Sequence, residues 1–185
     1  YTAYVLGMLK IVPFGRMSLF IIIGIFAIIN WYILKRLFKS STKKKDGRSE
    51  LKIIIFEEIL FLAAFLFWTY VRSQEPSIRT LEKFMDFGFM NSILRAEFFP
   101  PKDIWYSPEP INYYYFGHMG GAILMKITEI IPSIGYNLIL STLFAQGMTQ
   151  VFSITANIIT AYASKVKKVV VVIFGLFAAY ITNLG

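Results

Sequence analysis

Two carboxylates, Glu82 and Asp86, stand four residues apart in a stretch whose apolar pattern predicts a short helix with Thr80 as its N-cap. Side chains at this spacing share one helix face, and Arg79 and Lys83 flank them. One carboxylate could accept a proton from an attacking hydroxyl group while the two cations hold a phosphate. Asp86 and Glu82 are therefore candidate catalytic residues. Asp86 comes first, because the helix dipole alone explains an acid in the first turn, where Glu82 stands.

The surrounding stretch, residues 72–116, supplies candidate substrate-binding residues. The three consecutive tyrosines either anchor the stretch at a membrane surface or stack on a sugar or cover a lipid phosphate. His118 is the only histidine, and a divalent cation is one option if Asp86 and Asp103 converge with it. The sequence identifies no metal or cofactor beyond that option. The substrate-binding candidates are Arg72, Arg79, Lys83, Arg95, Asp103, Tyr113, Tyr114, Tyr115 and His118.

The composition of the chain is that of an integral membrane protein. Of its 185 residues, 56% are hydrophobic and 16% are charged, with a mean hydropathy of +0.59. A soluble domain has about 45–50% apolar and about 25% charged residues. There are no cysteines, which excludes disulfides, thiolate metal sites and cysteine nucleophiles. Soluble enzymes fit this composition poorly. A nucleic-acid-binding domain also fits poorly, because the net charge of +8 comes largely from one basic cluster, of which residues 39–50 contain no aromatic residue.

That basic cluster sets the expected orientation in the membrane. Eight of the 19 basic residues lie in the segment 35–52, between two apolar segments, as the positive-inside rule describes for a cytoplasmic loop. Residues 72–116 then form a loop outside the cytoplasm. Four segments are long and apolar enough to span the bilayer, namely 17–34, 53–71, 136–163 and 169–184.

Two further segments complete the expected organisation. Segment 117–131 is too short to span and carries Lys126 and Glu129, which predicts an interfacial helix at the outer surface. The segment 136–163 carries polar residues at helical spacing, which either form hydrogen bonds between helices or line a substrate groove. We therefore expect one multi-span α-helical bundle over residues 1–185, in the cell membrane. Because the chain begins with Tyr1 and not Met, and its first apolar stretch is short, we expect it to be a fragment of a longer protein. We expect this fragment to be the N-terminal part of that protein.

Several motifs in a fixed order resemble a known family. They are 82–87 (EKFMDF), 99–105 (FPPKDIW), 111–118 (INYYYFGH) and 136–138 (YNL). Together they resemble the prokaryotic "YYY" integral membrane proteins, a largely uncharacterised family with a triple tyrosine. The layout is also similar to that of the C-type (GT-C) membrane glycosyltransferases, in which an early outer loop carries an acid, then a tryptophan-containing stretch, then a short juxtamembrane helix.

The second resemblance implies a glycosyl transfer from a polyprenyl-phosphate sugar to an acceptor outside the cytoplasm. In that reading Asp86 activates the acceptor hydroxyl or holds a divalent cation against the donor phosphate. The partners are then the bilayer, a lipid-linked sugar and the remaining chain or other subunits, with no nucleic acid. The alternatives are a non-enzymatic scaffold or assembly subunit, whose loop docks a partner, and a transporter. Against a transporter, the sequence has no inverted repeat and no acid near the middle of a span.

Overall fold

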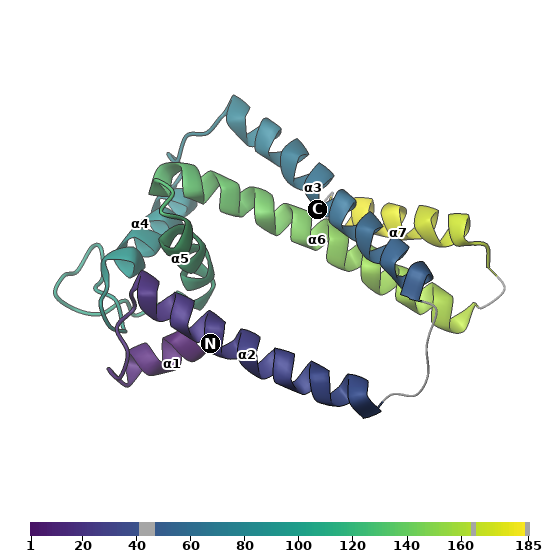
Figure 1. Cartoon of the computed structure of the whole chain (residues 1–185). Helices are drawn as coiled ribbons and strands as arrows, with labels where there is room; N and C mark the ends of the chain where they lie inside the picture. Colours follow the sequence, from purple (N-terminus) through teal and green to yellow (C-terminus); the bar gives the residue numbers. More distant parts are fainter. Residues whose placement is uncertain (41–46, 164–165, 184–185) are drawn as a thin grey trace. The chain divides into compact units, whose positions relative to one another are not determined.

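The computed structural model of the chain describes residues 1–40, 47–163 and 166–183. These residues form α-helices and one isolated β-bridge between Lys102 and Pro110, and no β-strand occurs among them. The prediction of an all-α protein is therefore confirmed. In chain order the helices are α1 (Thr2–Met8), α2 (Arg16–Ser40), α3 (Gly47–Gln74), α4 (Leu81–Arg95), α5 (Phe116–Thr128), α6 (Pro132–Tyr162) and α7 (Lys168–Thr182) (Figure 1).

Three of these helices are long and apolar enough to cross a bilayer. Their apolar lengths are Arg16–Leu37, Ile53–Gln74 and Pro132–Tyr162, with mean hydropathies of 2.3, 1.9 and 1.3. They coincide closely with three of the expected spans. Helix α7 is apolar but has 15 residues, and the expected span 169–184 ends outside the described residues. A crossing by α7 therefore stays a prediction.

The segment expected as a cytoplasmic loop, 35–52, is largely helical where it is described. Helix α2 continues to Ser40 and α3 begins at Gly47, whereas 41–46 lies outside the described residues. The physical reason is that lysine, arginine and glutamate are good helix formers, so a helix continues past the apolar length. The side of the membrane on which this segment lies remains a prediction.

The chain divides into two compact units. One unit contains Lys45–Pro76 and Asn137–Gly185, and therefore α3, most of α6, and α7. Its helices pack through aromatic rings: Trp68 stacks on Phe144 with ring centroids 4.4 Å apart, and Phe56 lies 5.1 Å from Phe152. A Cβ at Gly175 would lie 2.7 Å from the ring of Phe152, so glycine allows this close approach.

The polar residues of α6 satisfy many of their hydrogen bonds within the helix itself. The hydroxyl groups of Thr142, Thr149 and Thr160 each donate to the carbonyl four residues earlier, at 2.7–2.9 Å. The side-chain amide of Asn157 donates to the carbonyl of Ser153 at 2.9 Å. These bonds remove much of the cost of placing the polar face in a bilayer. These four side chains are therefore explained without either expected role, hydrogen bonding between helices or lining a substrate groove.

The other unit, Tyr1–Lys44 and Ser77–Tyr136, contains the expected outer loop from residue 77 onward and holds a hydrophobic core of its own. Helices α4 and α5 pack on each other, and α2 contacts both α1 and α5. The segment between α4 and α5 closes over this packing with its aromatic side chains. The loop is therefore a structured part of the protein. The buried core residues are Phe14, Leu19, Phe89, Ile93, Phe99, Ile111, Tyr115, Met119 and Ala122.

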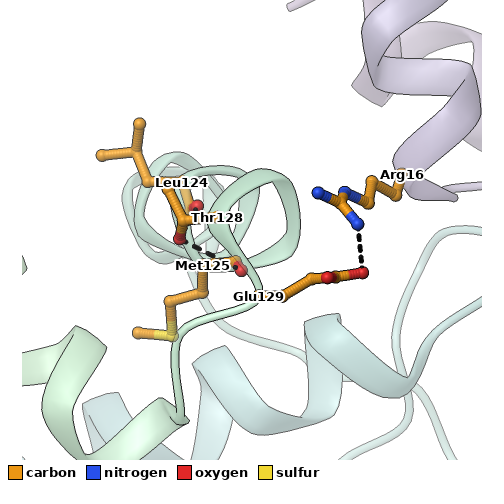
Figure 2. Close-up of polar contacts among 5 residues, drawn as sticks. All are labelled: Arg16, Leu124, Met125, Thr128 and Glu129. Atoms are coloured by element: carbon orange, nitrogen blue, oxygen red, sulfur yellow. Dashed lines mark hydrogen bonds and ion pairs between the residues drawn. The ribbon is translucent and has the colours of Figure 1, made fainter.

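Two charged side chains at the C-terminal end of helix α5, Lys126 and the C-cap Glu129, have partners within this unit. The ammonium group of Lys126 donates to the carbonyl of Leu94 at 2.9 Å and lies 4.4 Å from the ring centroid of Phe14. Burial lowers the pKa of Lys126. Glu129, the left-handed C-cap of α5, forms an ion pair with Arg16 at the start of α2 (Figure 2). The 13-residue helix is shorter than a span, and its charges have partners within the protein.

Candidate functional site

The central feature of the candidate site is a carboxylate–imidazole pair. Asp86 lies in the second turn of α4, and His118 lies in the first turn of α5. The Nε2 atom of His118 is 2.9 Å from Oδ1 of Asp86. The His118 side chain is 14% exposed and that of Asp86 is 35% exposed, so the carboxylate is the more accessible partner. The packing of α5 on α4 brings together two residues that are 32 positions apart in sequence.

The surroundings of His118 indicate which nitrogen carries the proton. An ionised carboxylate only accepts hydrogen bonds, so Nε2 must donate to Asp86. The Nδ1 atom is buried and has no hydrogen-bond partner in the described part of the chain. A proton there would leave a buried N–H group unsatisfied, at a cost of about 1–3 kcal/mol. Of the two tautomers of the imidazole, the geometry therefore favours the one with its proton on Nε2.

The other carboxylate oxygen, Oδ2, belongs to a side chain that is 35% exposed. Among the described residues it has no hydrogen-bond partner. Because His118 fixes the carboxylate through Oδ1, Oδ2 is held in one orientation. A hydroxyl group that reached Oδ2 could transfer its proton there, which is the chemistry expected of a general base.

Two of the three consecutive tyrosines lie near this carboxylate. The phenol of Tyr113 donates to the phenol oxygen of Tyr114 at 2.6 Å, and both side chains are exposed. This hydrogen bond first, then burial and the Tyr114 phenol, and last the negative charges of Asp86 and Glu82, raise the pKa of Tyr113. Tyr113 therefore stays a neutral phenol beside the acids. The structure thus brings Asp86, His118, Tyr113 and Tyr114 together, with Glu82 close enough to act on Tyr113 through its charge.

Phe89 packs against His118 and Tyr113 and is a site residue that the sequence analysis did not identify. Its buried ring contacts those of His118 at 5.6 Å and Tyr113 at 5.8 Å between centroids. The signal was available in the sequence, because Phe89 follows Asp86 by three residues and so shares its helix face. We include Phe89 as a positioning residue of the site.

The charged residues around α4 lie where a phosphate could reach them. Thr80 is the N-cap of α4, as predicted, and Glu82 lies exposed in the first turn. Arg79 is exposed immediately before the cap, and Lys83 is partly buried. The positive end of the α4 dipole lies at the same place, so this end of the helix is electrostatically suited to an anion.

Other predicted site residues lie elsewhere in the structure. Tyr115 is buried in the core, where burial first and a hydrogen bond with Tyr4 second raise its pKa, so it is not a surface group. Arg72 belongs to the other unit, where its guanidinium donates from Nε to Oδ1 of Asn137 at 3.1 Å. Arg95 is exposed in the last turn of α4, where a cation complements the helix dipole.

Asp103 has a structural task of its own. Its Oδ1 atom accepts hydrogen bonds from the backbone N–H groups of Trp105 and Tyr106, at 2.7 and 3.0 Å, and so closes a turn. Nowhere in the described ranges do three His, Cys, Asp or Glu side chains come together as a metal site. The expected convergence of Asp103 with Asp86 and His118 is therefore wrong, because its carboxylate is used in this turn.

Comparison with known proteins identifies the family. The model of a family described as uncharacterized membrane protein (DUF2298) matches residues 1–185. The chain belongs to this family of membrane proteins. Comparison with curated proteins and with solved structures gives no match.

Proposed function

We propose that this member of the DUF2298 membrane proteins is a glycosyltransferase that moves a sugar from a polyprenyl-phosphate donor to an acceptor outside the cytoplasm. The observation that carries the proposal is the Asp86–His118 pair, in which an accessible carboxylate is fixed by a buried imidazole. Such a pair is typical of a general base held by a second group. The similarity of the layout to GT-C enzymes supports the same class of reaction by analogy.

The proposed step is a displacement at the anomeric carbon of the donor sugar. The acceptor hydroxyl gives its proton to Oδ2 of Asp86, and its oxygen forms a bond to the anomeric carbon. The bond between that carbon and the phosphate oxygen breaks, and the electron pair leaves with the polyprenyl phosphate. Arg79 and Lys83, at the start of α4, stabilise the charge that grows on the phosphate. The Tyr113–Tyr114 pair covers the sugar or the phosphate.

A non-enzymatic scaffold is the second candidate function. The observation that favours it is that Asp86 is already paired and lines neither of two cavities found along residues 92–112. In a scaffold, the pair would only join α4 to α5, and the exposed charges would dock a protein partner. Both functions are compatible with membership of the family.

Native mass spectrometry of the purified full-length protein distinguishes the two. The enzyme reading predicts that the wild type retains a polyprenyl-phosphate lipid and that an Arg79→Ala/Asp86→Asn variant loses it. A Lys167→Ala variant, which removes an exposed cation from the other unit, is the matched control and should retain the lipid. Equal amounts of bulk phospholipid alone in all three proteins would contradict the proposal and favour the scaffold.

A further inference from the structure

Two neighbouring cavities lie along residues 92–112, and neither is lined by Asp86 or His118. Their volumes are about 630 and 530 Å³, and both are lined by Pro100 and Asp103, so they form one depression, which we call the loop groove. The size of each cavity lies within the range of about 300–1,000 Å³ that is usual for small-molecule sites. The groove is thus large enough to hold a ligand.

The walls of the loop groove are held in place by hydrogen bonds across the segment. The backbone N–H of Asp103 donates to the carbonyl of Glu109 at 2.7 Å, and that of Ile111 donates to the carbonyl of Pro101 at 3.0 Å. The hydroxyl of Ser92 on α4 donates to the carbonyl of Lys102. Prolines fix much of the remaining backbone. The groove is therefore formed before a ligand arrives, which lowers the entropy lost on binding.

The charges that line the groove are of both signs. The first cavity is lined by two cations, Arg95 and Lys102, and by two acids, Glu97 and Asp103. A phosphate or another multiply charged anion would meet repulsion from the acids. A neutral ligand with many hydroxyl groups uses both kinds of group, since each hydroxyl donates one hydrogen bond and accepts others. The lining therefore favours a polyhydroxyl ligand over a charged one.

One aromatic residue of the groove, and the residue before it in the chain, have large exposed side chains. Tyr106 lines the second cavity and is 74% exposed, and the adjacent Trp105 is 60% exposed. Their backbone N–H groups donate to Oδ1 of Asp103, which fixes the backbone of both residues. Flat apolar rings beside polar groups suit the flat faces of sugar rings, which carry C–H groups.

The ring of Phe89 connects the candidate catalytic pair to Trp105, the residue before the groove residue Tyr106. Phe89 contacts Trp105 with centroids 5.9 Å apart and contacts His118 at 5.6 Å. Ile104, which lines the first cavity, packs at Gly88, where an added Cβ would lie 2.3 Å from its Cδ1 atom. The groove residue Ile104 thus packs on α4 two residues after Asp86, and the α4 residues that line the groove are Ser92 and Arg95.

We propose that the loop groove binds a neutral oligosaccharide and that this is the acceptor of the transfer. The role of the oligosaccharide as acceptor rests on the proposed function, whereas its binding in the loop groove does not. Tyr106 stacks on one sugar ring, and the charged side chains of the first cavity bind the hydroxyl groups of the next.

Hydrogen–deuterium exchange of the full-length protein in nanodiscs tests this assignment. The neutral probes are maltohexaose and mannopentaose at millimolar concentration, and the anionic probe is inositol hexaphosphate. We expect a neutral probe to slow exchange in residues 99–112 and the anionic probe to leave it unchanged. Tyr106→Ala should weaken this binding about tenfold, which is about 1.4 kcal/mol, whereas Tyr106→Phe retains the ring and the affinity.

The outcomes separate the two proposals. Asp86→Asn should retain the protection by the neutral probe, so binding in this variant is measured independently of transfer. Glu129→Gln, an exposed change in the same unit outside the groove, is the control for general effects on folding. Protection by inositol hexaphosphate alone, no protection by either neutral probe, or protection that Tyr106→Ala leaves unchanged would each overturn the assignment.

Discussion

His118 and Asp86 join two helices through one hydrogen bond of 2.9 Å between Nε2 and Oδ1. The imidazole is mostly buried against Phe89, whereas the carboxylate remains about one-third exposed. The mostly buried imidazole of His118 therefore orients the more accessible carboxylate of Asp86. In the proposed reaction His118 is a positioning residue, and Asp86 is the group that meets the substrate.

The position of the proton on His118 is the first testable consequence. We expect Nε2 to carry the proton and Nδ1 to be bare, because Nδ1 is buried without a partner. Selective ¹⁵N labelling of histidine, with the resonance assigned by its loss in His118→Gln, reports this directly. In Asp86→Ala the acceptor of Nε2 is gone but Nδ1 stays buried without a partner, so the proton should remain on Nε2. A wild-type imidazole protonated on Nδ1 would contradict the assignment.

The close packing at Gly7 predicts how a substitution there affects the core of the unit that contains Asp86 and His118. An added Cβ would lie 2.5 Å from the ring of Phe99, which is 2% exposed and packs on Phe14 at 5.1 Å. Gly7→Ala should therefore lower the free energy of unfolding by about 1–3 kcal/mol. The matched control is Gly120→Ala, where nothing lies within 4 Å of the new Cβ. This control should raise stability by about 0.5–1 kcal/mol, because alanine is the better helix former.

Chemical denaturation of the purified protein in detergent measures both changes. A Gly7→Ala protein as stable as Gly120→Ala would show that Phe99 can move, and that the core is less tightly packed than described.

Much of the fold follows from the sequence, because long apolar segments must form helices in a bilayer. The cap at Thr80 and the short helix after the tyrosines were also predictable, since each depends on neighbouring residues. The pairing of Asp86 with His118 was only one of several options, because it depends on how α4 packs on α5. The burial of Tyr115 beside two exposed tyrosines depends on Tyr4 and Phe99, from α1 and from the segment that follows α4.

The Arg16–Glu129 ion pair predicts opposite effects of two substitutions at one position. Both side chains are substantially exposed, so Glu129→Gln should cost less than about 1 kcal/mol. Glu129 also has a φ of 57°, which costs a non-glycine residue about 1–2 kcal/mol. Glu129→Gly loses the ion pair but relieves this strain, so it should be at least as stable as the wild type. Denaturation midpoints at low and high salt measure both, and a Gly variant less stable than the Gln variant would contradict this reasoning.

Lys126 predicts a pH dependence of stability. Burial lowers its pKa in the folded state, so folding disfavours the charged form. The resulting destabilisation is present below the folded pKa and disappears as the pH rises to the unfolded value of about 10.4. The wild type should therefore gain stability relative to Lys126→Met as the pH is raised through this alkaline range. Unfolding of both proteins in parallel measures the difference, and a difference that does not change with pH would contradict it.

The most direct test of the central claim is the consumption of lipid-linked sugars by the Asp86→Asn variant. Full-length wild type, Asp86→Asn and Lys167→Ala proteins are reconstituted with polyprenyl-phosphate sugars extracted from the source membranes, and the released polyprenyl phosphate is quantified. We predict release by the wild type and the Lys167→Ala control. Release should fall by a factor of about 10²–10⁴ in a folded Asp86→Asn protein, since the general base is lost. Equal release by Asp86→Asn and the wild type would contradict the account.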